Sequence, residues 1–256
     1  AASDVYKRQY YANAISRSLM NSSDVIRKTV DLWKTEAKTT ENVTSLQSKL
    51  EGNAELKQML LSETPWLMDA TREAEQKQML ANYFDESQTA YRLADNFSRL
   101  SRLQNADGSF SWWKGMAGSP SMTMGVLTTF ARLDKMVGVQ PEARSMIDAA
   151  FLFMDKQIAQ EVKAMKAMKA SKDAKNLRPS ELAVDYLYAV TLQKRQLKGT
   201  AKDNAAYLLK LLAKQTSQFS IYTKSVAAVV LAGNNYAAEA RDMVQSIKEY
   251  LSLIHI

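Results

Sequence analysis

The residues of this chain that could carry out chemistry are almost all carboxylates. The 256-residue sequence contains no cysteine, and its one histidine is His255, close to the C-terminus. A general acid and a general base could in principle come from four acidic side chains, Glu73, Glu75, Asp85 and Glu86. No histidine, cysteine or glycine-rich turn accompanies them, and helical surfaces bring such pairs together frequently. We therefore predict no catalytic residue, no cofactor and no metal site, and we expect the chain not to be an enzyme.

A second group that could bind a partner is a run of basic residues between positions 156 and 178. Its members are Lys156, Lys163, Lys166, Lys169, Lys172, Lys175 and Arg178. Such a run is typical of the solvated face of a long helix, and a site for an anionic partner is the alternative. Aromatic residues are not interleaved with these charges, as they are in surfaces that bind single-stranded nucleic acid. We therefore expect no nucleic-acid partner.

One short stretch, residues 103–115, is not explained by helix formation alone. The residues that distinguish it are Gln104, Asp107, Gly108, Phe110, Trp112, Trp113, Lys114 and Gly115. Glycine adopts positive φ angles without steric penalty, and an aspartate can accept hydrogen bonds from nearby amides, so Asp107-Gly108 predicts a chain reversal. Three aromatic residues directly after a turn indicate a packed loop. We expect Phe110, Trp112 and Trp113 to pack against the ends of a helical hairpin, with a ligand or carbohydrate platform as the alternative.

A further motif, Glu63-Thr64-Pro65-Trp66, predicts the start of a helix. Thr64 is suited to the N-cap position, and Pro65 to the first turn, where no amide donor is needed. Trp66 would then anchor this helix start by packing. The motif needs no additional role.

Both ends of the chain are predicted to be adapter-derived rather than native. Residues 1–9 match the translation of a common transposase-based sequencing adapter, and residues 251–256 match its mosaic end read in the opposite sense. We therefore expect the native segment to be residues 10–250, cut from a longer open reading frame. Excluding both ends removes His255, and the loss of Lys7, Arg8 and Asp4 lowers the formal net charge from +7 to +6.

The elements that must position these residues are helices joined by short breaks. Apolar residues recur at helical spacing, and no run of alternating β-branched residues is long enough for a sheet. A helix is also expected after a cap at Ser22 or Ser23. The other main predicted helices cover residues 10–20, 39–50, 53–60, 64–84, 85–103, 120–137, 141–169, 180–198, 221–231 and 236–250, and one more begins at Thr200. The sequence thus predicts an all-α fold.

The number of helices and the short connections between them suggest antiparallel hairpins, stacked in a solenoid or closed into an α/α ring. No strict repeat length is present, which favours the ring. Residues 182–190 and 226–231 are apolar on more than one side, as inner-layer helices of a two-layer ring would be. We therefore expect an incomplete α/α toroid. The apolar run at residues 226–232 is too short to span a bilayer, so no membrane insertion by this segment is expected.

Five motifs follow one another along the first half of the chain. They are Tyr10-Tyr-Ala-Asn-Ala14, Asn53-Ala-Glu-Leu-Lys57, Glu63-Thr-Pro-Trp66, Glu75-Gln-Lys77, and residues 103–116 followed by Ser121-Met-Thr123. In this order they resemble the thioester-domain region of bacterial α2-macroglobulin-like proteins, particularly the long Bacteroidetes type. The turn that starts at Gln104 is similar to one that recurs in the terpenoid cyclase and prenyltransferase toroid superfamily, which includes this domain. The resemblance is strongest over residues 10–133.

The resemblance implies a protease trap. In that family a protease cleaves a bait region elsewhere in the chain, and the molecule then rearranges and encloses the protease. Members with a Cys-x-Glu-Gln thioester also capture it covalently. That motif would lie just before Tyr10, within residues 1–9. The resemblance thus implies a non-catalytic scaffold domain of an extracytoplasmic endopeptidase inhibitor, with proteases and other macroglobulin domains of the same chain as partners.

Two enzyme classes on similar helical rings are the alternatives. A terpenoid cyclase needs an Asp-x-Asp-Asp cluster, and a prenyltransferase needs Asp, Cys and His around zinc. Residues 10–250 contain neither set. A glycan-processing toroid would need paired carboxylates on loops at one mouth of the ring, but the predicted loops are short and carry few acids. An interaction or binding module on the same ring is the remaining alternative.

Overall fold

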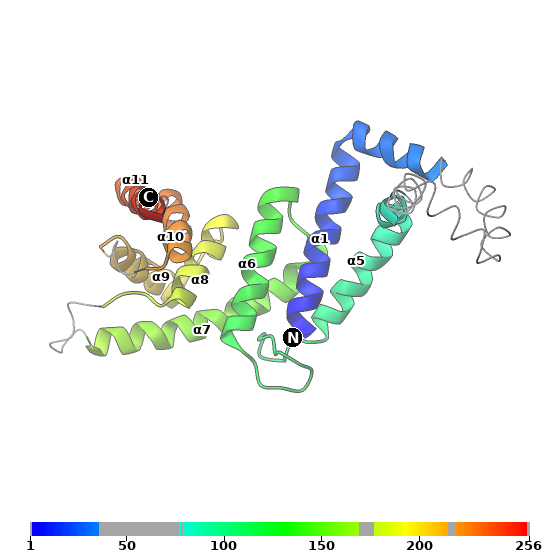
Figure 1. Ribbon diagram of the computed structural model, residues 1–256. Helices are drawn as coiled ribbons and strands as arrows, with labels where there is room; N and C mark the ends of the chain where they lie inside the picture. Colours follow the sequence, from blue (N-terminus) through cyan, green and yellow to red (C-terminus); the bar gives the residue numbers. More distant parts are fainter. Residues whose placement is uncertain (1, 36–76, 78, 169–176, 215–218, 255–256) are drawn as a thin grey trace, which may run out of the picture. The chain divides into compact units, whose positions relative to one another are not determined.

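The computed structural model describes residues 2–35, 77, 79–168, 177–214 and 219–254 (Figure 1). These residues are mainly helical and contain no β-strand; the single β-bridge among them pairs Gln104 with Phe110. The predicted all-α class is therefore confirmed. The chain divides into two compact units, one formed by Ala12–Asp95 and the other by Ala1–Tyr11 together with Asn96–Ile256.

The unit formed by Ala12–Asp95 contains most of α1 (Ala2–Ser22), a helix over residues 24–35, and the start of α5 (Glu86–Ser101). The predicted cap at Ser23 is confirmed, because its Oγ accepts a hydrogen bond from the Ile26 amide at 3.3 Å. The predicted start of a helix near Asp85 is also confirmed. The helices predicted for residues 39–50 and 53–60, and most of the one predicted for 64–84, lie outside the described residues.

Asp85 is a helix cap in this unit and not half of an acid/base pair. Its Oδ1 accepts hydrogen bonds from the Ser87 hydroxyl at 2.5 Å and the Gln88 amide at 3.1 Å, and its Oδ2 lies 3.2 Å from Lys34 Nζ. These contacts, led by the Ser87 hydrogen bond, hold the pKa of Asp85 well below its usual range. Glu73 and Glu75 lie outside the described residues.

The other unit is built from the remaining helices, which begin mostly where the sequence predicts. In α6 the Ser119 hydroxyl accepts from the Met122 amide, Pro120 is the first helical residue, and Gly138 follows the helix with φ 92°. In α8 the Ser180 hydroxyl accepts from the Ala183 amide at 3.1 Å. The elements are α6 (Pro120–Val137), the 3-10 turn η1 (Pro141–Ala143), α7 (Arg144–Met168), α8 (Glu181–Leu192), α9 (Gly199–Leu212), α10 (Ile221–Gly233) and α11 (Ala237–Ile254).

The predicted end of the α8 helix is wrong. The helix was expected to reach residue 198, but it ends at Leu192, because Lys194 takes a left-handed conformation with φ 48°. The Lys194 amide donates to the Thr191 carbonyl and the Arg195 amide to the Val190 carbonyl, which is the Schellman pattern of helix termination. Glycine is the usual residue at this position, and lysine carries no such signal.

The two terminal helices also extend further than predicted. Helix α1 begins at Ala2 rather than near Tyr10, and α11 continues to Ile254 rather than ending near Tyr250. Both therefore include residues that are predicted from the sequence to be adapter-derived.

From α6 to α10, helices two apart in the chain are neighbours in space, and α11 packs on α10. Helix α6 packs on α8, and α8 on α10; α7 packs on α9. The side chains of Ala183, Val184, Tyr186 and Leu187 are all buried, so α8 is apolar on more than one side, as expected of a helix covered by neighbours on several faces. Two-layer packing of alternating helices follows from these contacts. Closure of the helices into a ring remains a prediction.

The core of this unit is aromatic and aliphatic. Tyr10 stacks on Phe130 with ring centroids 5.1 Å apart and contacts Phe97 at 6.1 Å. Its hydroxyl donates to Glu142 at 2.6 Å, so the buried phenol is satisfied. Phe151 meets Tyr186 edge-on at 6.2 Å, which joins α7 to α8.

Candidate functional site

The loop between α5 and α6 forms a small closed hairpin. Gln104 and Phe110 make an antiparallel bridge, and within it the Asn105 amide donates to the Ser109 carbonyl at 2.8 Å. The Gly108 amide closes the turn by donating to the Asn105 carbonyl at 2.9 Å. The predicted chain reversal at Asp107-Gly108 is confirmed.

Asp107 stabilises this turn through its side chain. Its Oδ1 accepts a hydrogen bond from the Ser109 hydroxyl at 2.6 Å and another from the Ser109 amide at 3.0 Å. These two bonds lower the pKa of Asp107, the hydroxyl bond contributing most. The carboxylate is exposed and committed to the turn, so its geometry is that of a loop-stabilising residue.

Gly108 and Gln104 attach the hairpin to α7. Gly108 has φ 89°, and a Cβ built on it would lie 2.1 Å from the Ala149 carbonyl oxygen, so only glycine fits there. Gln104 Nε2 donates to the Met146 carbonyl at 2.8 Å and to the Gly108 carbonyl at 3.0 Å. The Gln-x-x-Asp-Gly spacing therefore serves close docking of a turn on a helix.

Phe110 is the anchor of the loop. Its side chain is fully buried, its amide donates to the Thr123 hydroxyl at 2.8 Å, and its carbonyl accepts from the Ser119 amide at 2.8 Å. The ring thus enters the core while its backbone is fixed to the first turn of α6. The expectation that Phe110 packs is confirmed.

The two tryptophans do not pack as expected. Trp112 is 45% exposed and Trp113 is 57% exposed. The physical reason is that the core position is filled by Phe110, and the chain then bends outward through a turn in which the Met116 amide donates to the Trp113 carbonyl. Lys114 is exposed as well, and Gly115, with φ 84°, has open space around it.

The partners of the loop were not identified from the sequence. The Thr123 hydroxyl accepts a hydrogen bond from the Phe110 amide, and the Met146 carbonyl accepts one from Gln104. The Ala149 carbonyl lies against Gly108. Within the loop, Ser111 Oγ donates to the Trp113 carbonyl at 2.7 Å. Thr123 lies four residues after the Ser119 cap, so the sequence places it on the first turn of α6, next to the end of the loop. The α7 partners are carbonyl groups, which leave no signal in residue type. Thr64, Pro65 and Trp66 lie outside the described residues.

A polar cluster on α6, α8 and α10 also escaped prediction. Arg132 donates to the Tyr188 hydroxyl at 3.4 Å and to the Tyr222 hydroxyl at 3.2 Å, and its guanidinium lies over the Tyr188 ring. Burial raises the pKa of Asp185 on the same surface, and the charge of Arg132 opposes that shift. The cluster links three helices that are neighbours in the packing.

The basic run is solvated where the structure describes it. Lys156, Lys163 and Lys166 are exposed on α7, and Lys166 Nζ lies 5.2 Å from the centre of the Tyr207 ring. Residues 169–176 lie outside the described part of the chain. For the described lysines, the interpretation as a solvated helix face agrees with their exposure.

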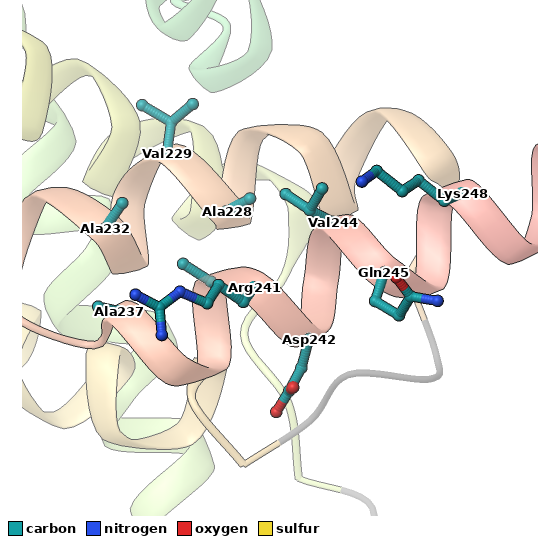
Figure 2. A pocket seen from close by; sticks show the side chains of 10 residues that line it. Ala228, Val229, Ala232, Ala237, Arg241, Asp242, Val244, Gln245 and Lys248 are labelled. Atoms are coloured by element: carbon teal, nitrogen blue, oxygen red, sulfur yellow. The ribbon is translucent and has the colours of Figure 1, made fainter.

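A surface groove of about 650 Å³ runs between α10 and α11 (Figure 2). Its floor is made of small and aliphatic side chains, among them Ala228 and Val244, and Asp242 points away from α10 in the close-up. Arg241 and Lys248 lie at its edges. The charged groups do not converge on one point, so the groove has the character of a helix-packing surface rather than of a reaction site.

The described residues contain no group of three or more His, Cys, Asp or Glu side chains placed to hold a metal ion. In that same part of the chain, no helix combines the length and apolarity that crossing a membrane requires. No protein-family model, curated protein or solved structure matches the chain.

Proposed function

We propose that this chain is a non-catalytic scaffold domain of a bacterial, Bacteroidetes-type α2-macroglobulin-like endopeptidase inhibitor. The observation that carries the proposal is the ordered set of motifs from Tyr10 to Thr123, centred on the hairpin at Gln104 to Phe110. The protein would work outside the cytoplasm, and its partners would be proteases and the other macroglobulin domains of its chain.

The geometry of the loop supports a structural role for its residues. Asp107 accepts a hydrogen bond within the turn, and Gln104 donates one to α7. The ring of Phe110 is buried in the core. A group that has to act on a substrate needs free donors, acceptors or ionisable atoms near a binding cavity. These residues instead hold a helical connection rigid, which suits a scaffold.

The packing of alternating helices supports a toroid-type domain. Helices α6, α8 and α10 follow one another in contact, as do α7 and α9, and such layers are what an α/α ring or a helical solenoid requires. In a trap, a stiff domain of this kind would transmit the rearrangement that follows bait cleavage. No catalytic residue, cofactor or metal is assigned to it.

The genomic locus that encodes residues 10–250 provides the test. We expect its full product to enclose a protease: the trapped protease should still cleave a small chromogenic peptide but lose activity on a protein substrate such as casein. A thioester upstream of Tyr10 would add a covalent protease adduct that is stable in denaturant. A product that leaves casein cleavage unchanged, with intact and bait-cleaved forms both tested, would refute the proposal.

A further inference from the structure

A second cavity lies where the end of α6, the turn η1, the start of α7 and the segment after α8 meet. Its volume is about 200 Å³, below the roughly 300–1,000 Å³ of sites for drug-sized ligands. Phe130, Val139 and Ile147 provide apolar walls, and charged side chains stand at its edges. The cavity therefore suits a molecule about the size of a single amino acid.

Asp134 provides the negative charge of this cavity. Its Oδ2 accepts a hydrogen bond from Gln193 Nε2 at 2.8 Å, and the Gln140 amide is a second, neutral donor. Burial raises the pKa of this half-buried carboxyl. Within the described residues no lysine or arginine forms an ion pair with it. Its hydrogen-bond donors are neutral, and the charge of Arg144 acts on it and lowers its pKa, which opposes the effect of burial. A partly desolvated carboxylate is favourably matched by a cationic group of a ligand that donates hydrogen bonds to it directly.

The positive charge available at the cavity is that of Arg144. Arg195 is already matched, because its Nη1 lies 2.6 Å from Asp148 Oδ1 and its guanidinium stacks 4.3 Å from the centre of the Phe151 ring. Arg144 is exposed and makes no ion pair among the described residues. The cavity thus offers one carboxylate and one guanidinium that are not ion-paired, beside an apolar wall.

The segment after α8 is bent so that two of its side chains reach this cavity. Lys194 has φ 48°, a backbone conformation that residues with a Cβ rarely adopt. The residues on either side of it, Gln193 and Arg195, both line the cavity. A helix that continued past Leu192, as the sequence predicts, would not present these side chains in the same way.

We propose that this cavity binds a small zwitterion, specifically a free α-amino acid with an apolar side chain. The ammonium group would bind Asp134 and the carboxylate Arg144, while the side chain would lie against Phe130, Val139 and Ile147. A simple cation or anion could bind only one of these two charged groups. This proposal is independent of the trap function, because it rests on a different part of the domain.

Isothermal titration calorimetry of the full chain with L-leucine tests the site. We expect a dissociation constant of about 1 mM or lower. N-acetyl-leucine lacks the ammonium and leucinamide lacks the carboxylate, so each should bind at least about tenfold more weakly, as expected when a charged hydrogen-bonding partner is lost. Asp134→Asn and Arg144→Gln should each weaken leucine binding by a similar factor.

Matched control variants separate binding from folding. Asp185→Asn changes another carboxyl whose pKa is raised by burial, and Arg241→Gln changes an exposed arginine on α11; neither lines the cavity, so both should bind leucine as the parent chain does. Thermal unfolding followed by circular dichroism shows whether each variant is folded. Because Arg144 is exposed, Arg144→Gln tests the site even if Asp134→Asn does not fold. Absence of leucine binding by the folded parent chain, equal binding of all three ligands, or unchanged binding by Arg144→Gln would overturn the proposal.

Discussion

The two halves of the loop between α5 and α6 have similar residue types but opposite environments. In the first half, Phe110 is fully buried and Gly108 lies against the backbone of α7. In the second half, Trp112 and Trp113 are about half exposed, and Gly115 has open space around it. Each half contains at least one aromatic residue and a glycine with positive φ, so residue type alone does not distinguish them.

The difference shows that side chains fix the first half to distant helices, whereas the aromatic side chains of the second half are left half exposed. The distant contacts of the second half are made by its backbone: the Ala2 amide donates to the Trp112 carbonyl at 3.1 Å and the Ser3 hydroxyl to the Ser111 carbonyl at 2.6 Å. The Gln104 side chain and Gly108 meet α7, and the Phe110 amide meets Thr123 of α6. Substitutions in the first half should therefore cost much more stability than the equivalent substitutions in the second.

The largest difference is expected for the aromatic residues. Phe110→Ala should lower the free energy of unfolding by about 3–5 kcal/mol, because it removes a fully buried ring and leaves a cavity. Trp113→Ala should cost less than about 1 kcal/mol, because that ring is more than half exposed. Urea denaturation followed by circular dichroism measures both. Equal losses would show that the two halves are packed alike.

The glycines provide the second comparison. Gly108→Ala should destabilise the fold by about 3 kcal/mol, combining the cost of a left-handed residue with a steric clash against the Ala149 carbonyl. Gly115→Ala has the same backbone strain but no clash, so about 1 kcal/mol is expected. The shift of the urea midpoint measures the contribution of the close approach. A loss of stability for Gly115→Ala as large as that for Gly108→Ala would contradict the prediction that the close approach to Ala149 makes Gly108 the more sensitive position.

Substitution of Gln104, whose side chain joins the hairpin to α7, should lower the stability of the fold by a smaller amount. Gln104→Ala removes the hydrogen bonds to the Met146 and Gly108 carbonyls, and should cost about 1–2 kcal/mol. Lys114→Ala, at an exposed position of the second half, should change stability by less than about 0.5 kcal/mol. Thermal melts of the two variants beside the parent chain provide the measurement. If Lys114→Ala lost as much stability as Gln104→Ala, polar side chains of the two halves of the loop would contribute equally to stability.

The smallest effect expected in the first half of the loop, and the only one expected to depend on pH, is at Asp107. Its folded-state pKa lies below the ordinary value of 3.8, so its stabilising contribution is present above that value and is lost as the pH falls through the folded-state pKa. Asp107→Ala should cost about 1 kcal/mol at about pH 6, and the difference from the parent chain should shrink at about pH 3.

Asp107→Asn is the matched control, because an amide oxygen can still accept both Ser109 hydrogen bonds and does not titrate in this range. Its stability relative to Asp107→Ala should change little with pH. Urea midpoints measured across the pH range test this. If the difference in stability between the parent chain and Asp107→Ala grew on acidification, the pH dependence would have the opposite sign, and the ionised Asp107 would not be the stabilising form.

Helix ends show the same division between local and distant causes. The Gly233-Asn234-Asn235 segment predicts the end of α10, and Asn235 there has φ 67°, which asparagine tolerates well. The end of α8 has the equivalent long hydrogen bond, from the Arg195 amide to the Val190 carbonyl as from the Tyr236 amide to the Leu231 carbonyl in α10, with Lys194 in the left-handed position. Lysine is not a termination signal, and the conformation is held by contacts such as the ion pair of Arg195 with Asp148.

The sequence by itself determined the features that depend on neighbouring residues. These are the all-α class, the helix starts near Pro120 and Ser180, and the chain reversal at Asp107-Gly108, because a helix start or a turn is formed by atoms a few residues apart. The tertiary structure alone decided which aromatic side chain of the loop is buried, where α8 ends, and which charges border the cavity beside Asp134. Those outcomes depend on atoms of α6 and α7 that lie far away in sequence, and a carbonyl oxygen or an unfilled space there leaves no trace in residue type.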